Sequence, residues 1–243
     1  CDDFVISSGK SYAIKEIMFE DDNLTLAPRR AEKIFDLMIE KKLNICWDTP
    51  NGVAAFALKE DLISKMQKSG CYKLNLALES GNQYVLDNII KKPLKLKKAK
   101  RLIRHAQEIG LDVGIYLIMG LPGETKEQIW DSFYLAKELR IYTPFISIAT
   151  PYPGSELFEI CRENKYIADD FSLDDLFIRS FSISTENWTG EEIREILRQG
   201  QRFLLKSYLV AHPQKFIKKA IKYMINNPSD FLIETFNFIV RGD

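Results

Sequence analysis

Short apolar runs alternate with amphipathic segments along the first 165 residues of the chain. Residues 115–119 carry five apolar or aromatic side chains in a row, and Gly120, Pro122 and Gly123 then end the run. This pattern predicts a strand buried on both faces, followed by a tight turn. Thr125 is then placed to cap a helix that reaches Leu139. Similar runs predict five strands in all, over residues 15–19, 44–47, 71–78, 115–119 and 145–149.

The spacing of these strands indicates the fold class. Amphipathic helical segments separate them at a repeat of roughly 30 residues, which is typical of a parallel α/β sheet. Right-handed crossovers build such units into an open doubly wound sheet or a barrel-like arc. After about residue 165 the strands stop, amphipathic helices are predicted over 191–210 and 213–226, and residues 231–240 are more apolar still. We therefore expect an α/β domain over residues 1–165 and a helical C-terminal extension over 166–243.

Composition excludes several classes of partner. Lys+Arg and Asp+Glu both number 34, so the chain has no global field that would favour nucleic acid or an acidic membrane surface. The basic residues between Lys91 and Arg104 interleave with apolar ones at helical spacing, which indicates an exposed helix face rather than a strong nucleic-acid signal. No apolar run reaches the roughly 18 to 20 residues that span a bilayer. The expected partner is a small-molecule substrate.

The four cysteines, Cys1, Cys46, Cys71 and Cys161, lie far apart and form no C-x-x-C. This spacing indicates neither a disulfide framework nor a self-contained zinc site, and it favours a reducing, cytoplasmic setting. Cys46 and Cys71 lie in or beside predicted strands, where a free cysteine is most often a small core residue.

Polar residues and glycines gather where the predicted strands end. Because the carboxyl ends of parallel strands meet at one edge, these residues are expected to share a rim. Carboxylates, a hydroxyl and glycines on one rim suit a ligand with an amine, a ribose and a carboxylate. The strand ends are Glu20-Asp21-Asp22, Pro50-Asn51-Gly52, Glu79-Ser80, Gly120 to Glu124 and Thr150-Pro151.

Four of these motifs, in this order and at compatible distances, resemble the radical S-adenosylmethionine superfamily. The resemblance is closest to the subgroup that often carries a cobalamin-binding domain ahead of the radical domain. It implies a partial parallel (β/α) barrel of about six strands when complete, of which five are visible. The motifs are Phe19 to Asn23, Gly70 to Gly81, Met119 to Thr125 and Thr150 to Ser155.

The resemblance also implies roles for individual residues. Glu20 and Asp21 match the segment that holds the methionine amino group, and Glu20 is the stronger candidate, because an ammonium donates charge-assisted hydrogen bonds to a carboxylate. Glu79 and Ser80 match the site that contacts the ribose hydroxyls or the methionine carboxylate. The strand around Ile118 and the turn at Gly120 match the adenine side, where the backbone makes the contacts. Thr150 and Pro151 match the strand that closes the pocket. No catalytic side chain is predicted.

One family motif is missing. These enzymes hold a 4Fe-4S cluster through C-x-x-x-C-x-x-C after their first strand, and the chain has no such motif. Cys1 stands where the last cysteine of that loop would lie. Either the chain begins inside the motif, with the first strand and the earlier cysteines lost, or the cluster is absent and the domain is degenerate. Without three thiolates the cluster cannot be held, so the chain as printed is expected to be inactive.

The functional hypothesis follows from the resemblance. It implies an enzyme core that binds S-adenosylmethionine and, in the full-length protein, an iron-sulfur cluster, for radical-based modification of a substrate. A preceding cobalamin domain would favour methyl transfer. Two alternatives stay open, namely methylthiolation of a nucleotide or protein side chain and a non-catalytic binding scaffold.

Overall fold

The computed structural model describes residues 4–7, 10–21, 23–168, 171, 181–214, 221 and 225. Cys1, Asp22, most of the predicted helix over 213–226 and the apolar segment 231–240 lie outside the described residues.

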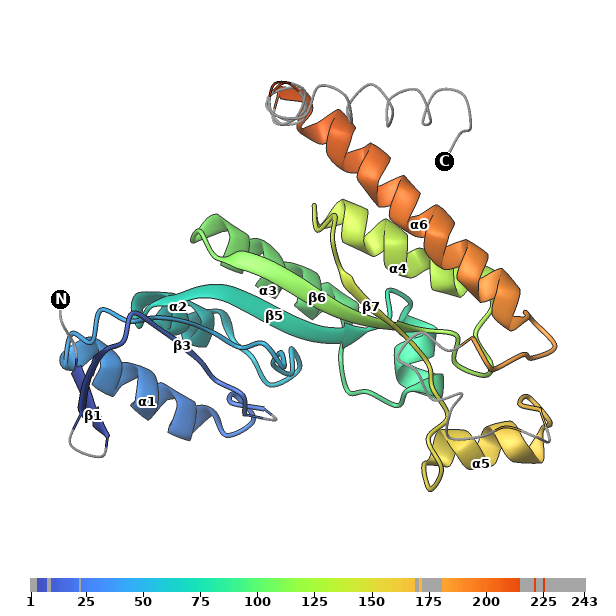
Figure 1. Ribbon diagram of the computed structural model, residues 1–243, viewed down its shortest axis with the longest axis horizontal. Coiled ribbons are helices and arrows are strands. Elements are labelled where there is room, and N and C mark those ends of the chain that lie inside the picture. Colours follow the sequence, from blue (N-terminus) through green and yellow to red (C-terminus); the bar gives the residue numbers. More distant parts are fainter. Residues whose placement is uncertain are drawn as a thin grey trace.

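Five parallel strands form one sheet (Figure 1). Their order in space, β3-β4-β5-β6-β7, is their order in sequence, whereas a doubly wound sheet reverses direction at a switch point. The sheet is a curled half-barrel, so the predicted partial barrel and its five strands are confirmed. The strands are β3 (Glu16–Met18), β4 (Cys46–Asp48), β5 (Cys71–Glu79), β6 (Asp112–Met119) and β7 (Phe145–Ile148).

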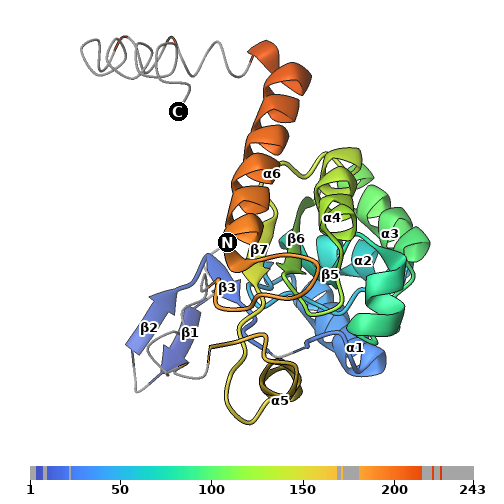
Figure 2. The ribbon, with the colours of Figure 1, turned by 90° about the vertical axis from the view of Figure 1, so that its right-hand side faces the viewer.

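Four helices cover one face of this sheet (Figure 2). Apolar side chains of the strands meet their apolar faces: Phe35 stacks on Trp47 at a ring-centroid distance of 5.1 Å. Leu74, Leu76 and Leu78 of β5 are fully buried, and the alternate positions therefore point to the opposite face. The helices are α1 (Pro28–Glu40), α2 (Glu60–Lys68), α3 (Leu96–Glu108) and α4 (Lys126–Glu138).

Local signals predicted the element boundaries well. Thr125 caps α4, because its hydroxyl accepts a hydrogen bond from the backbone of Gln128 in a capping box. A π-helical turn, η1 (Val85–Ile89), follows β5 and precedes α3. The basic side chains of α3 lie at its surface, where Lys100 and Arg104 both pair with Glu138. This arrangement agrees with an exposed helix face.

A hairpin and two further helices lie outside the five-stranded sheet. An antiparallel hairpin of β1 (Phe4–Ser7) and β2 (Lys10–Ala13) was not predicted. After α5 (Glu156–Glu163), the long helix α6 (Gly190–Ala211) packs on α4, and the two approach so closely that a Cβ on Gly200 would lie 2.1 Å from the Phe133 ring. Ile193, Ile196 and Leu197 of α6 join the common core, and the boundary at residue 165 stays a prediction. Within the described part of the chain, no helix is long and apolar enough to cross a membrane.

Candidate functional site

The predicted site residues lie at or just after the carboxyl ends of four strands. Glu20 and Asp21 come after β3, Glu79 ends β5 and Ser80 follows it, Gly120 follows β6, and Thr150 comes after β7. Since all five strands are parallel, these positions lie along one edge of the curled sheet. The polar environment differs from one strand end to the next.

The two acidic residues after β3 are used differently. Asp21 accepts a hydrogen bond from the backbone of Asn23 at 2.9 Å and forms an ion pair with Arg30 at 3.1 Å, which ties the loop to α1. The Glu20 carboxylate is exposed and has no hydrogen-bond or ion-pair partner among the described residues. Glu20 is therefore the carboxylate that remains available for a ligand ammonium group.

Glu79 forms an ion pair that sequence reasoning missed. Its Oε1 lies 2.8 Å from Nζ of Lys92, and the two side chains are only 19% and 14% exposed. Its backbone is left-handed, with φ 73°, which is uncommon for a residue other than glycine. The sequence gave no sign that Lys92 would pair with Glu79, because only the tertiary structure brings the two side chains together.

The turn after Glu79 is anchored to α4. The buried Ser80 hydroxyl accepts a hydrogen bond from the backbone of Asn82 at 3.1 Å, and the backbone of Gly81 donates to the Ser132 hydroxyl at 2.9 Å. A Cβ on Gly81 would lie 2.5 Å from the Asp131 carbonyl oxygen, so only glycine fits there. Ser80 thus organises the turn that carries Glu79.

The turn after β6 is closed upon itself. The Glu124 side chain is 1% exposed and accepts hydrogen bonds from the backbone of Gly120 and of Leu121, the latter at 2.8 Å. Burial raises the pKa of this carboxyl group to about 7, although the two backbone donors oppose the shift. Trp188 donates its indole N–H to the Glu124 carbonyl oxygen at 3.0 Å. Glu124 is therefore a structural residue.

The remaining predicted residues contribute shape. Ile118 is half-buried on β6, and Gly120 adopts φ 80° at the end of that strand. The Thr150 hydroxyl donates to the carbonyl oxygen of Ile148 at 3.1 Å, and Pro151 is buried. Backbone contacts at Ile118 and Gly120 are compatible with the predicted adenine side, and this role remains a prediction.

Asp48 and Thr49 are polar residues whose burial the sequence did not reveal. They end β4, they are 7% and 2% exposed, and atoms Oδ1 and Oγ1 have no hydrogen-bond partner within the described ranges. Burial raises the pKa of Asp48, while the charge of Lys73 opposes the rise. The amide of Asn75 donates to the Thr49 carbonyl oxygen at 3.1 Å and fixes this segment. The available signal was an acidic residue, Asp48, two positions before the turn-forming Pro50-Asn51-Gly52.

The described cysteines do not fit an iron-sulfur cluster. Cys46 is exposed on β4, whereas Cys71 and Cys161 are buried, and burial raises the pKa of their thiols to about 12 and about 11. No group of three His, Cys, Asp or Glu side chains within the described ranges is arranged to hold a metal ion. Such a cluster needs thiolates, so these three residues cannot supply its ligand set. Cys1, the metal-ligand candidate, lies outside the described residues.

A curled parallel sheet with this rim defines the class of protein. The family model described as the radical SAM superfamily matches residues 5–136, which is more than half of the chain. The chain belongs to the radical SAM superfamily, as its motifs predicted, and that family uses S-adenosylmethionine and a 4Fe-4S cluster.

Two curated relatives are methyltransferases by name. The cytidylyl-2-hydroxyethylphosphonate methyltransferase of Streptomyces wedmorensis is 32% identical over 207 residues, covering 82% of this chain and 38% of that protein. An uncharacterized methyltransferase of Pyrococcus horikoshii is 29% identical over 226 residues, covering 88% and 47% respectively. The chain thus spans less than half the length of either relative.

A solved structure has the same fold. It is the radical S-adenosylmethionine methyltransferase TsrM of Kitasatospora setae, determined with cobalamin and a 4Fe-4S cluster bound. The TM-score is 0.55 at 14% sequence identity, with 63% of this chain and 31% of that chain covered. This likeness is one of fold.

Proposed function

We propose that this chain is the S-adenosylmethionine-binding core of a radical methyltransferase that acts on a small molecule. The observation that carries the proposal is the 32% identity, over 82% of the chain, to a protein that is a methyltransferase by name. The reaction and substrate of the full-length protein belong to this proposal, because the chain spans only part of its relatives.

The rim residues suit the cofactor. Glu20 offers a carboxylate that has no partner among the described residues for the methionine ammonium group, and Glu79, in its ion pair with Lys92, offers acceptor oxygens. The backbone of Ile118 and Gly120 would contact the adenine, and Thr150 and Pro151 would close the pocket, while Asp21 and Ser80 hold the loops that carry the two glutamates. Bound S-adenosylmethionine supplies a transferable methyl group or, after one-electron reduction, a carbon radical.

The proposal places the remaining cofactors outside the described residues. The cluster ligands would lie there, with Cys1 as one of them, because the described cysteines do not fit the cluster. A cobalamin-binding domain elsewhere in the full-length protein is included, because the motifs resemble the subgroup that often carries one. The free cysteines favour a cytoplasmic setting.

The cofactor site is tested on the anaerobically reconstituted full-length protein. Calorimetry with S-adenosylhomocysteine, which has the amino group, and with 5′-methylthioadenosine, which lacks it, separates the two ends of the ligand. Glu20→Gln should weaken binding of the first about tenfold and leave the second unchanged. Asp21→Asn, the matched control, should change both only slightly. A wild-type protein that binds neither ligand would refute the proposal.

The reaction is tested with S-adenosylmethionine that carries a deuterated methyl group. The full-length enzyme, a reductant and a small-molecule extract of the source cells are incubated, and the products are analysed by mass spectrometry. A product that gains one labelled methyl group supports methyl transfer. A product that gains a methylthio group replaces this proposal with methylthiolation, and iron uptake without any labelled product contradicts transfer to a small molecule.

A further inference from the structure

The segment after β4 is the strand end that the proposed cofactor site does not use. It contains the turn-forming Pro50-Asn51-Gly52, which has no role in the family resemblance. The pairing of β4 with β5 shifts just before Asp48, and the chain pairs with β5 again only at Val53. Residues 48–52 therefore form a bulge, which we call the β4 bulge. Bulges re-aim side chains and are over-represented next to active sites.

The β4 bulge lies on the inner face of the sheet, opposite the face that α1 to α4 cover (Figure 2). Trp47 stacks on Phe35 of α1, so the next residue along the strand, Asp48, is directed to the inner face. On β5, Asn75 alternates in the same way with Leu74, which belongs to the core beneath the helices. The bulge and the neighbouring strands thus present polar groups to the same side.

Two side chains of the neighbouring strands hold the bulge in place. The Asn75 amide donates to the Thr49 carbonyl oxygen at 3.1 Å, and the Tyr116 hydroxyl donates to the Pro50 carbonyl oxygen. Gly52 closes the bulge, because its N–H donates to the Thr49 carbonyl oxygen at 3.0 Å. Gly52 adopts φ 79°, and a Cβ there would lie 2.9 Å from the Tyr116 ring. The bulge is therefore a fixed element whose position is set by β5 and β6.

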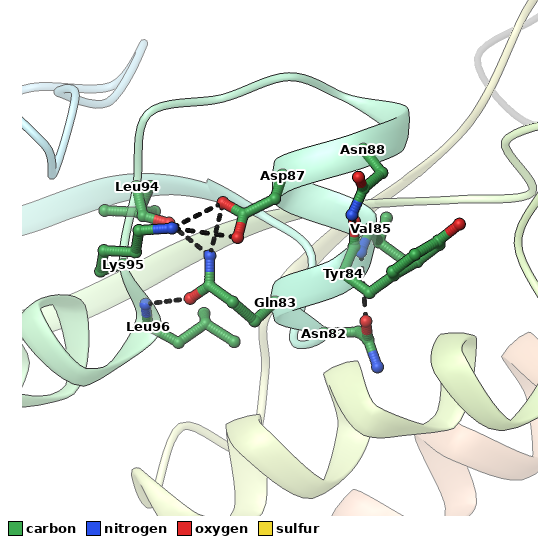
Figure 3. A network of polar contacts seen from close by, with 9 residues as sticks. All are labelled: Asn82, Gln83, Tyr84, Val85, Asp87, Asn88, Leu94, Lys95 and Leu96. Atoms are coloured by element: carbon green, nitrogen blue, oxygen red, sulfur yellow. Dashed lines mark hydrogen bonds and ion pairs between the residues drawn. The ribbon is translucent and has the colours of Figure 1, made fainter.

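Two side chains of the bulge lack the partners that polar groups elsewhere have. In the loop between β5 and α3, the Gln83 amide donates to Asp87 at 2.9 Å and to the Leu94 carbonyl oxygen at 3.0 Å (Figure 3). In the β4 bulge, Asp48 Oδ1 and Thr49 Oγ1 are enclosed and have no hydrogen-bond partner within the described part of the chain. Buried polar atoms almost always have one, so a partner for these two atoms is missing.

The charges around Asp48 indicate the chemistry of the missing partner. The sheet register places Lys73 between Asp48 on β4 and Asp112 on β6. None of these three side chains forms an ion pair among the residues that the structure describes. A cationic group would face Lys73, and an anionic group would face two carboxylates. A neutral group that donates a hydrogen bond, such as a hydroxyl or an amide, therefore fits Asp48 best.

We infer that the β4 bulge recognises a neutral hydroxyl or amide group of the substrate. Asp48 and Thr49 accept its hydrogen bond, and Asn51, the exposed residue of the bulge, offers one amide donor and one acceptor beside them. Asn75 and Tyr116 are positioning residues, because they hold the bulge and do not touch the substrate. This inference rests on the proposed function, and it adds a substrate site to the cofactor site.

The substrate contacts are tested on the reconstituted full-length protein with the deuterated-methyl assay. Serial dilution of the small-molecule extract gives an apparent KM and a maximal rate, and calorimetry with S-adenosylhomocysteine reports on the cofactor site. Asn51→Ala and Asp48→Asn should each raise the apparent KM about tenfold and leave the affinity for S-adenosylhomocysteine unchanged. Asn164→Ala is the matched control, because Asn164 is exposed at the end of α5 and should behave like the wild type.

The positioning role is tested with Tyr116→Phe, which removes the hydrogen bond to Pro50. Hydrogen exchange of the Gly52 and Val53 amides should become faster, and the apparent KM should rise severalfold while the maximal rate changes little. Tyr72→Phe is the matched control, because it removes a hydroxyl of the same sheet that donates to Glu16 at 2.5 Å. Faster exchange with an unchanged apparent KM would mean that the bulge is structural, which overturns the inference.

The remaining outcomes separate the inference from the proposed function. A wild-type protein that binds no S-adenosylhomocysteine, or that makes no labelled product, refutes the proposed function. An active wild type with an unchanged apparent KM in Asn51→Ala refutes the inference alone, and so does a labelled product with neither a hydroxyl nor an amide group. Weaker binding of S-adenosylhomocysteine in the variants would assign the bulge to the cofactor instead. If Asp48→Asn melts earlier but keeps its KM, an enclosed water is the partner and the contact is wrong. If it does not fold, Asn51→Ala decides.

Discussion

The turns after β5 and β6 look alike in sequence and differ in structure. Each follows a buried strand, and each contains a glycine and a glutamate. After β6, Glu124 points into its own turn and receives backbone hydrogen bonds, whereas after β5 Glu79 meets a lysine from a distant loop. A glutamate at a strand end is therefore not by itself a sign of a binding site. The partners of its carboxylate decide whether it can act on a ligand.

The two turns also differ in what covers them. The segment before α6 lies on the β6 turn, where Asn187 and Trp188 both donate to the Glu124 carbonyl oxygen. The β5 turn is supported from below by α4, through Gly81 and Ser132. The β6 turn is thus part of the core between the barrel and α6, whereas the β5 turn is held by α4 without being covered.

The largest effect is expected from the Glu124 charge. Its pKa is about 7 in the folded protein against 4.5 as the ordinary value, so the folded state binds the proton more tightly. The contribution of Glu124 to the free energy of unfolding should therefore be complete below about pH 4 and should fall by about 3 kcal/mol as the pH rises from about 4 to about 8. Glu124→Gln should remove that part of the fall in urea titrations. Glu127→Gln, at an exposed position, is the control, and an unchanged slope in Glu124→Gln would place the titrating group elsewhere.

Adding a methyl group at Gly81 and at Gly123 separates the cost of a steric clash from the cost of an unfavourable backbone conformation. Gly81→Ala should cost about 2 kcal/mol, because the Cβ would meet the rigid backbone of α4. It should also weaken S-adenosylhomocysteine binding, since Glu79 moves with the turn. Gly123→Ala has room for its Cβ and is disfavoured only by φ 91°, at about 1 kcal/mol. Equal losses of stability for the two variants in thermal melts, or unchanged ligand affinity in Gly81→Ala, would contradict this prediction.

Removing the cover of the β6 turn should have a smaller effect. Trp188→Phe keeps most of the buried ring and loses one hydrogen bond to the Glu124 carbonyl oxygen, at a cost of about 1 kcal/mol. Ligand affinity should stay the same, because Glu79 is untouched. Tyr166→Phe removes an exposed hydroxyl that bonds Glu186 and serves as the control. Lost affinity in Trp188→Phe would show that the β6 turn reaches the ligand.

The smallest effect is expected at the ion pair after β3. Arg30 and Asp21 are 55% and 38% exposed, and solvent-exposed pairs contribute about 1 kcal/mol or less. Arg30→Gln should therefore melt near the wild-type temperature and bind S-adenosylhomocysteine normally. A tenfold loss of affinity in Arg30→Gln would show that the Arg30–Asp21 ion pair is needed to hold the β3 loop in its ligand-binding position.

The sequence allowed the strands to be predicted, because apolar runs and caps act over a few residues. Residues 115–119 and Thr125 are examples, and both lie as expected in β6 and at the start of α4. The shared rim followed from parallel strands. The β1–β2 hairpin was missed, because its apolar run is short and its pairing is antiparallel. The burial of Asp48 was missed because a polar residue beside a turn motif looks the same whether it is exposed or enclosed.

By itself, the sequence determined the α/β alternation, the family and the edge of the sheet that carries the candidate site. Those features depend on periodicity and on motifs that are local in the chain. Only the tertiary structure decided that Glu79 has Lys92 as its partner, that Glu124 is enclosed, and that Trp188 covers the β6 turn. The physical reason is that the burial of a carboxylate, and therefore its pKa, depends on elements that pack over it in the folded chain, which no local pattern encodes.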